Sequence, residues 1–158
     1  MRVPDLDTGD PMPDTTLVDG DGNSIRLRDR LGRPLVVYFY PKDDTFGCTK
    51  EACTFRDHYE DFLAAGADVI GVSRDDAESH AKFKAQNRLP FTLLTDPGGK
   101  VAEAWNVKGR LGLPGRITFV FDQDGVLRHR FDSMIRFGKH VEEALEVVKK
   151  LARAERRG

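Results

Sequence analysis

The chain has 158 residues, and its 25 basic and 26 acidic side chains leave a formal net charge of −1. This balance, with no long block of like charge before the C-terminal tail, argues against a nucleic-acid-binding protein. No apolar run approaches the roughly 18 residues of a membrane span, so we expect no membrane association. A chain of this length can bury one core, and we expect residues 1–158 to form a single domain.

The N-terminus lacks the apolar segment and small-residue cleavage site of a signal peptide, so we expect a soluble protein of the cytoplasm. Thiols are kept reduced in that compartment. Cys48 and Cys53, the only cysteines of the chain, are therefore expected to be reactive, metal-binding or simply buried, rather than joined in a permanent bridge.

The first elements of the chain are predicted to be strands. Residues 15–18 and 24–27 alternate polar and apolar side chains on either side of a turn with two glycines, which predicts an N-terminal β-hairpin. The apolar run 35–40 predicts a central strand that is covered on both faces.

Helices and strands then follow one another. Apolar residues three or four positions apart predict one helix over 48–65, ended by Gly66. The later elements are expected in this order: strand 67–72, a helix from residue 77 capped by Asp75 or Asp76, strand 91–94, short helix 100–105, a hairpin of 116–122 and 125–131, and helix 137–154.

This alternation predicts an α/β fold with a mixed central sheet flanked by helices on both faces. Ligand sites in such folds lie at the carboxyl ends of parallel strands. Cys48 follows the apolar strand 35–40 and lies at the start of a predicted helix, so topology makes it a candidate site residue.

The position of Cys48 favours a reactive thiol. The first turn of a helix stabilises negative charge because its amide groups lack partners within the helix, and a thiol reacts as the thiolate. Thr45 is placed either to cap this helix or to direct its hydroxyl towards a ligand of the sulfur. Pro41 fixes the direction of the chain as it leaves the strand, and Gly47 leaves room for a ligand to approach the backbone.

The spacing of the two cysteines argues against a static disulfide. Five residues on a helix advance ~7.5 Å and turn ~140°, which places the two Cα atoms roughly 8.6 Å apart, beyond the ~7 Å limit for a disulfide. A bond between Cys48 and Cys53 therefore requires this part of the helix to unwind. Such a geometry suits a redox-linked bond, in which Cys48 is oxidised first and Cys53 condenses with it.

Two other interpretations of the cysteines remain open. A metal site would need about four ligands, and the four histidines of the chain are scattered rather than spaced for zinc. A general thiol–disulfide exchanger is expected to carry Cys-x-x-Cys, which this chain lacks.

Two motifs resemble those of a known family. The segment from Pro41 to Cys53, Pro-x-x-x-Thr-x-x-Cys-Thr-x-Glu-x-Cys, resembles the active-site signature of peroxiredoxins of the bacterioferritin comigratory protein or PrxQ group. The segment Gly-Arg-Ile-Thr-Phe-Val-Phe-Asp at 115–122 is similar to the arginine-bearing strand of that group, and further similarity extends through 71–76 and 89–96.

The resemblance implies a thioredoxin-like fold with an N-terminal hairpin, and an enzyme that uses thiols to reduce hydrogen peroxide and organic hydroperoxides. Cys48 would be the peroxidatic cysteine and Cys53 the resolving cysteine, with Pro41, Thr45 and Arg116 shaping the peroxide pocket. A thioredoxin or similar dithiol protein would be the reductant, with no metal or organic cofactor. We expect a monomer, with a weak dimer as the alternative.

The side chains match these implied roles chemically. The guanidinium of Arg116 would stabilise the thiolate and hold both peroxide oxygens, and the hydroxyl of Thr45 can both accept and donate. From the residues alone, Arg116 would be an ordinary surface arginine and Glu51 a solvated or capping acid, whereas the family pattern makes Glu51 the partner that orients Arg116. Phe46 stands where many relatives have proline, and would either loosen the loop or form a pocket wall that favours bulky hydroperoxides.

Overall fold

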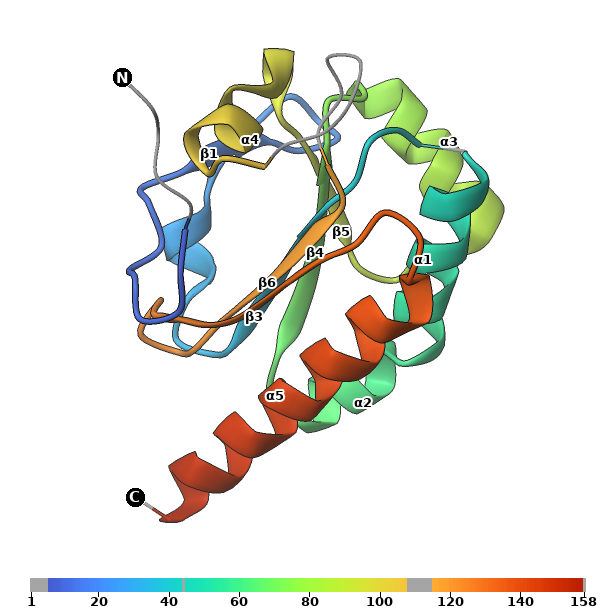
Figure 1. Ribbon diagram of the computed structural model, residues 1–158. Helices are drawn as coiled ribbons and strands as arrows, with labels where there is room; N and C mark the ends of the chain where they lie inside the picture. Colours follow the sequence, from blue (N-terminus) through green and yellow to red (C-terminus); the bar gives the residue numbers. More distant parts are fainter. Residues whose placement is uncertain (1–5, 44, 108–114, 158) are drawn as a thin grey trace.

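The computed structural model describes residues 6–43, 45–107 and 115–157, and in these ranges seven strands form one mixed sheet (Figure 1). The strands are β1 (Thr16–Val18), β2 (Ser24–Arg26), β3 (Leu35–Phe39), β4 (Asp68–Ser73), β5 (Thr92–Thr95), β6 (Ile117–Phe121) and β7 (Leu127–Asp132). Their order across the sheet is β2-β1-β5-β4-β3-β6-β7.

The centre of the sheet is parallel and its edges are antiparallel. β3 pairs with β4, and β4 with β5, in parallel, while β6 runs antiparallel to β3 and β7 antiparallel to β6. The antiparallel pair of β1 and β2 confirms the predicted N-terminal hairpin, and β1 joins the sheet through Val18 and Thr95 of β5. The predicted α/β class with a mixed sheet is also confirmed.

The helices are α1 (Phe46–Asp57), α2 (Tyr59–Ala64), α3 (Ala77–Asn87), α4 (Lys100–Ala104) and α5 (Phe137–Arg157), with 3-10 turns η1 (Leu27–Arg30) and η2 (Pro97–Gly99). The single helix predicted over 48–65 is wrong, because the chain breaks at His58 (φ −107°, ψ 5°) into α1 and α2. Phe55 and Phe62 are buried on both sides of this break, so the apolar spacing continues through it and does not reveal it.

The central strand β3 sends alternate side chains to opposite faces of the sheet, as the period of a strand requires. Val36, Tyr38 and Tyr40 lie in the cluster under α1, α2, α3 and α5, and Leu35, Val37 and Phe39 lie in the cluster on the other face. All five residues of β3 are fully buried, which confirms the strand predicted from the apolar run.

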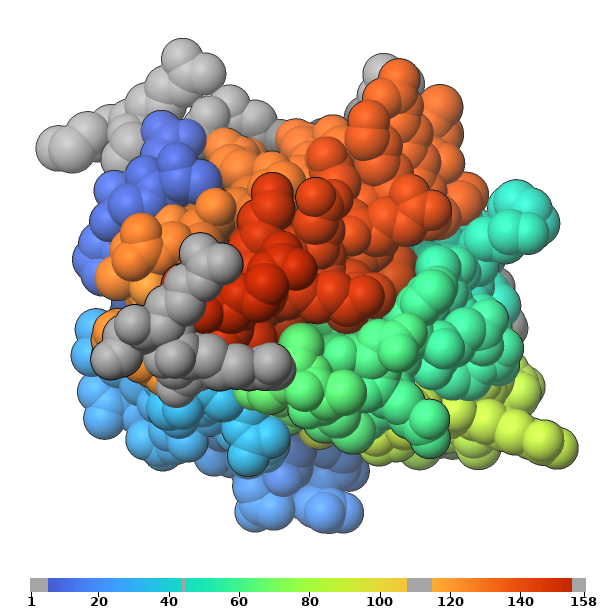
Figure 2. Space-filling model, turned by 90° about the horizontal axis from the view of Figure 1, so that it is seen from below, coloured from blue at the N-terminus to red at the C-terminus, as the bar shows by residue number. Residues whose placement is uncertain are grey.

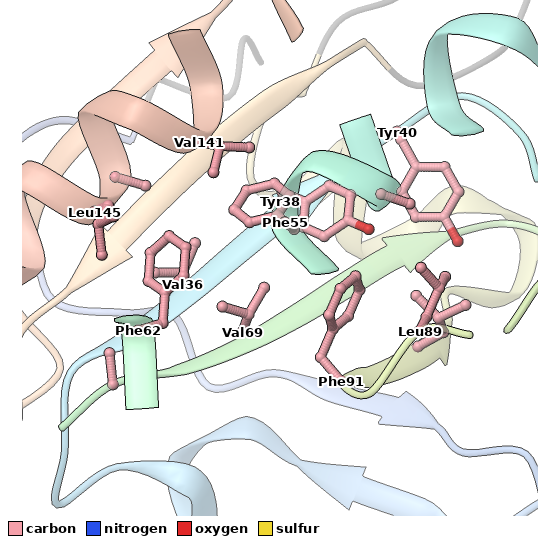
Figure 3. Packing of buried hydrophobic residues seen from close by; sticks show 14 of the residues in the cluster. Val36, Tyr38, Tyr40, Phe55, Phe62, Val69, Leu89, Phe91, Val141 and Leu145 are labelled. Carbon is pink, nitrogen blue, oxygen red and sulfur yellow. The ribbon is translucent and has the colours of Figure 1, made fainter. Parts of the chain in front are cut away.

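The first cluster joins the sheet to the helix that carries both cysteines. Figure 3 shows the ring of Tyr38 on β3 beside the ring of Phe55 on α1, and their centroids are 4.5 Å apart. Phe62, Phe91 and Val141 extend this cluster towards α2, the start of β5 and α5 (Figure 3). α1 is therefore positioned by aromatic packing against the centre of the sheet.

The opposite face is covered by α4 and the N-terminal segment. Trp105, which follows α4, packs against Phe39 and Phe119, and its indole N–H donates to the hydroxyl of Thr15 at 3.0 Å. On the face of the sheet opposite to α4, α5 lies beside α2, as the view from below shows (Figure 2). None of the described helices is both long and apolar enough to cross a lipid bilayer.

Gly71 on β4 is a position where close packing requires glycine. A Cβ there would lie 2.8 Å from Cδ2 of Leu93 and 2.9 Å from Cζ of Tyr38. Gly71→Ala is therefore expected to lower the free energy of unfolding by about 1–3 kcal/mol in urea titrations.

Gly138→Ala is the matched control, since its Cβ would meet nothing within 4 Å on an exposed turn of α5. This variant is expected to be unchanged or stabilised by up to about 1 kcal/mol. Equal stabilities of the two variants would contradict the packing described for β4.

Candidate active site

Cys48 is the third residue of α1 and is 1% exposed. The helix begins at Phe46, two residues before the predicted start at Cys48, and Thr45 is its N-cap residue with extended backbone angles (φ −90°, ψ 157°). The first intrahelical bond runs from the amide of Thr49 to the carbonyl of Thr45 at 2.8 Å. The amides before it have no partner within the helix, so Cys48 lies at the positive end of the helix dipole.

Arg116 stands directly before β6 and joins three segments of the chain. Its Nη2 donates to Sγ of Cys48 at 3.3 Å, its Nη1 to Oε1 of Glu51 at 2.9 Å, and its Nε to the carbonyl of Met134 at 3.1 Å. The residue is 3% exposed, so its interpretation as an ordinary surface arginine is wrong. A buried guanidinium needs such acceptors because its charge has been removed from water.

Glu51 lies one turn after Cys48 on α1 and is completely buried, so its interpretation as a solvated acid is also wrong. Its Oε1 accepts from Arg116, while its Oε2 has no hydrogen-bond partner among the described residues and lies 3.6 Å from Nδ1 of His140. Burial raises the pKa of Glu51 to about 7, although the charge and the hydrogen bond of Arg116 act to lower it.

His140 and Thr118 complete the buried polar group, and sequence reasoning missed both. Nε2 of His140 donates to the carbonyl of Ser133 at 2.7 Å, so Nδ1 accepts from the hydroxyl of Thr118 at 2.8 Å. Burial lowers the pKa of His140 to about 4 against the effect of the Ser133 bond, and the charge of Arg116 lowers it further. The ring is therefore neutral at physiological pH.

One signal for Thr118 was present in the sequence. It lies two residues after Arg116, and the period of a strand places side chains two positions apart on the same face. His140 had no such signal, because only the packing of α5 on β6 brings it to Glu51.

Gly47 lets two neighbouring side chains approach its backbone closely. A Cβ at this position would lie 2.8 Å from Cζ of Phe137 and 3.0 Å from Nη2 of Arg116. The Phe137 ring itself packs against Arg116, with its centroid 5.0 Å from Cζ. The expected open space for a ligand beside Gly47 is therefore filled by these two side chains.

Side chains of α3 hold the loop before α1 in place through hydrogen bonds. Asp43 is buried and accepts hydrogen bonds from the hydroxyls of Tyr40 and Ser79, and its Oδ2 lies 2.7 Å from Nδ1 of His80. Its amide donates to Asp75 at 2.7 Å. Of the two caps predicted for α3, only Asp76 binds the helix, through the amide of Ser79 at 2.8 Å.

Three predicted pocket residues lie on this loop or at the start of α1. Thr45 is exposed and its hydroxyl donates to the carbonyl of Lys42 at 3.1 Å, so it does not cap α1 through its side chain and its lone pairs stay free to accept. Pro41 is half-buried directly after Tyr40. Phe46 is 79% exposed on the first turn of α1.

Cys53 is half-buried on the same uninterrupted helix as Cys48, and both thiols are free. Its Sγ is 3.6 Å from Oδ1 of Asn87, the last residue of α3, which sequence reasoning did not identify. Among the described residues, no group of three or more His, Cys, Asp or Glu side chains is arranged to hold a metal ion. The site is thus a thiol at a helix N-terminus beside a buried guanidinium, with a second thiol on the same helix.

A sheet-and-helix fold with this site is typical of thiol-based redox enzymes, and comparison with known proteins identifies the class. Residues 8–130 match the model of the AhpC/TSA family, and the chain belongs to this family. It is 50% identical over 145 residues to chloroplastic peroxiredoxin Q of Oryza sativa subsp. japonica, an alignment that covers 90% of the chain and 67% of the relative.

Two solved structures have the same fold. The crystal structure of peroxidoxin BcpB from Mycobacterium tuberculosis superposes with a TM-score of 0.85 at 37% identity, covering 92% of this chain and 97% of the other. Peroxiredoxin Q from Xanthomonas campestris gives a TM-score of 0.79 at 32% identity, covering 87% and 91%. The resemblance to this peroxiredoxin group and its thioredoxin-like fold are confirmed, and the chain is a thiol-dependent peroxidase.

The expected cytoplasmic location is wrong. The curated relatives from Oryza sativa, Suaeda salsa and Populus jackii are chloroplastic proteins, which contradicts that expectation. The fold is shared with the bacterial structures, so the fold carries no information about the compartment.

The opposite pKa shifts of Glu51 and His140 predict a pH dependence of stability. The pKa of Glu51 is raised from 4.5 to about 7, so its contribution is full below pH 4.5 and is lost as the pH rises through about 7. The pKa of His140 is lowered from 6.5 to about 4, so its contribution is present above pH 6.5 and is lost as the pH falls through about 4. Between these values the two contributions offset each other.

Glu51→Gln removes the contribution of Glu51 to the pH dependence of stability and leaves the contribution of His140. The free energy of unfolding of this variant should then rise with pH between about 4.5 and 6.5, by up to ~1.4 kcal/mol per pH unit, more steeply than in the unmodified protein. Urea titrations across this pH range measure how the free energy of unfolding changes with pH in the variant and in the unmodified protein. Glu142→Gln, on an exposed position of α5, should follow the unmodified protein, and identical slopes for all three proteins would contradict the assignment.

Proposed function

We propose that Cys48 is the peroxidatic cysteine and Cys53 the resolving cysteine of this peroxidase. The Cys48 thiolate attacks one oxygen of the hydroperoxide, the O–O bond breaks, and the other oxygen leaves as water or an alcohol after taking a proton. Cys53 then attacks the sulfenic sulfur, forming the disulfide and releasing water. A thioredoxin-like dithiol returns two electrons and two protons to the pair.

The observation that carries this proposal is the hydrogen bond from Nη2 of Arg116 to Sγ of Cys48, at 3.3 Å in a buried site. A fixed positive charge at this distance stabilises the thiolate and the negative charge that develops on the leaving oxygen. Because Nη1 and Nε are occupied by Glu51 and Met134, the remaining guanidinium edge faces the sulfur. Glu51 therefore acts as the residue that orients Arg116.

The loop residues supply the rest of the peroxide pocket in this proposal. The hydroxyl proton of Thr45 is directed at the carbonyl of Lys42, which leaves its lone pairs to accept from the O–H of the hydroperoxide. Pro41 restricts the chain where the pocket begins, and Gly47 lets Arg116 and Phe137 approach the first turn of α1.

The proposed substrates include organic hydroperoxides. A solved relative from Xanthomonas campestris, 31% identical with a TM-score of 0.82, is described by its alkyl peroxide reduction activity. Phe46 exposes a large apolar surface on the first turn of α1, two residues before Cys48, which supports organic hydroperoxides as substrates as well as hydrogen peroxide.

We propose that residues 1–158 form one domain, which is supported by a single sheet with a core cluster on each face. We also propose a monomer, with a weak dimer as the alternative. In the described ranges four large apolar side chains are exposed, Phe46, Leu63, Met134 and Ile135, a small number for an obligate interface.

Mass spectrometry after one equivalent of hydrogen peroxide tests the two cysteine roles. The reduced protein should lose two hydrogens, and peptide mapping should place a bond between Cys48 and Cys53. Cys53→Ser should stop at a Cys48 sulfenic acid after a single turnover, whereas Cys48→Ser should leave the peroxide unconsumed. Full thioredoxin-dependent peroxidase activity in Cys48→Ser would overturn the proposal.

A further inference from the structure

The thiol of Cys53 is held by the C-terminal end of α3. Its Sγ lies 3.6 Å from Oδ1 of Asn87, a distance at which the S–H group donates a weak hydrogen bond to the amide oxygen. Cys53 lies on α1 and Asn87 is the last residue of α3, so this bond links the two helices.

Asn87 is itself held in one orientation. Its Nδ2 donates to the carbonyl of Phe83, one turn earlier on α3, at 3.0 Å. This bond assigns the nitrogen to the Phe83 side and leaves the oxygen facing Cys53. Phe83 is 1% exposed and belongs to the core cluster beneath the helices, so the amide is anchored to a rigid part of the fold.

A second contact joins the same residues of α3 to α1. Nη1 of Arg56 donates to the main-chain carbonyl of Asn87 at 2.8 Å. Arg56 follows Cys53 by three positions, so both side chains project from the same face of α1. Asn87 thus holds α1 through its side chain at Cys53 and through its backbone one turn later.

These contacts matter because the disulfide cannot form while α1 is helical at Cys53. The spacing of five residues keeps the two sulfurs apart until the helix opens between them. Opening moves Cys53 away from α3 and breaks its bond to Asn87, whereas the Arg56 bond lies beyond the segment that must unwind. The Asn87 side chain is therefore a contact that resolution must break.

We propose that Asn87 is a positioning residue for the second step of the cycle, which holds Cys53 in the helical form of α1 and lengthens the life of the Cys48 sulfenic acid. This inference rests on the proposed resolving role of Cys53. During that lifetime the sulfenic acid either condenses with Cys53 and releases water, or reacts with a second hydroperoxide to give the sulfinic acid and an alcohol or water. Asn87 thus sets the balance between turnover and overoxidation.

The first step should not depend on Asn87. The hydrogen-bond partners of Cys48 and Glu51 come from Arg116 on the other side of α1, whereas Asn87 contacts Cys53 and Arg56. Removing the Asn87 amide should therefore change the rate of disulfide formation and leave the rate of sulfenic acid formation unaltered.

Rapid-quench mass spectrometry of the full chain tests this proposal. Reduced protein is mixed with one equivalent of hydrogen peroxide, and Cys48 sulfenic acid and disulfide are quantified over time. In Asn87→Ala, disulfide should form about three- to tenfold faster, the effect of one lost hydrogen bond, with the first step unchanged. With excess peroxide and a dithiol reductant, the fraction of Cys48 sulfinic acid per turnover should fall by a similar factor.

Two further variants separate this role from a general loosening of α3. Asn87→Asp loses the Nδ2 donor to Phe83 but keeps oxygen acceptors at this position, and its negative charge disfavours the Cys53 thiolate, so its disulfide should form no faster than in the unmodified protein. Gln86→Ala, on the adjacent exposed position of the same helix, should behave as the unmodified protein in both steps. Equal acceleration in Asn87→Ala and Asn87→Asp, an unchanged disulfide rate in Asn87→Ala, or a slowed first step in that variant would each overturn the proposal.

Cys53→Ser, measured in parallel, distinguishes failure of this inference from failure of the proposed function. If Cys53→Ser accumulates sulfenic acid while Asn87→Ala resolves at the original rate, the resolving role of Cys53 stands and the role of Asn87 is wrong. If Cys53→Ser still loses two hydrogens, the proposed resolving role fails, and the role of Asn87 fails with it.

Discussion

The position of both cysteines on one uninterrupted helix is the constraint on which this site depends. Cys48 occupies the third position of α1, where unpaired amides and Arg116 favour its negative charge. The same helical turns place Cys53 roughly 8.6 Å away between Cα atoms and direct it towards α3. The helical conformation that suits attack on peroxide therefore excludes the disulfide, and a cycle that uses both thiols needs α1 in two conformations.

The buried charge of Arg116 explains why the helical form is the resting one. Its acceptors come from α1, through Cys48 and Glu51, and from the loop before α5, through Met134. Unwinding between Cys48 and Cys53 moves Glu51, and a buried charge that loses its partner typically costs about 3–5 kcal/mol. In the proposed cycle, reduction of the disulfide lets α1 refold onto Arg116, so the charge that we propose activates the thiol also restores the site.

Local patterns predicted the parts of this fold that depend on local sequence. The apolar run of β3, the N-terminal hairpin and α5 followed from periodicity, and the family motif brought Cys48 and Arg116 together. Other contacts between distant segments were not predictable: Glu51 is buried because α5 and β6 close over it, and His140 and Asn87 reach the site from other helices. The break at His58 was not predicted, because the apolar spacing continues across it. The compartment was predicted wrongly, because the fold and the site residues do not determine it.

Amide hydrogen exchange of the reduced and the disulfide forms tests the two conformations of α1 most directly. Main-chain amides from Cys48 to Cys53 should lose protection when the disulfide forms, because the helical hydrogen bonds of this segment must break. Amides of β3 and of the middle of α5 should keep theirs, since the core clusters on which they pack do not change. Unchanged protection of α1 in protein whose Cys48–Cys53 bond has been mapped would contradict the account.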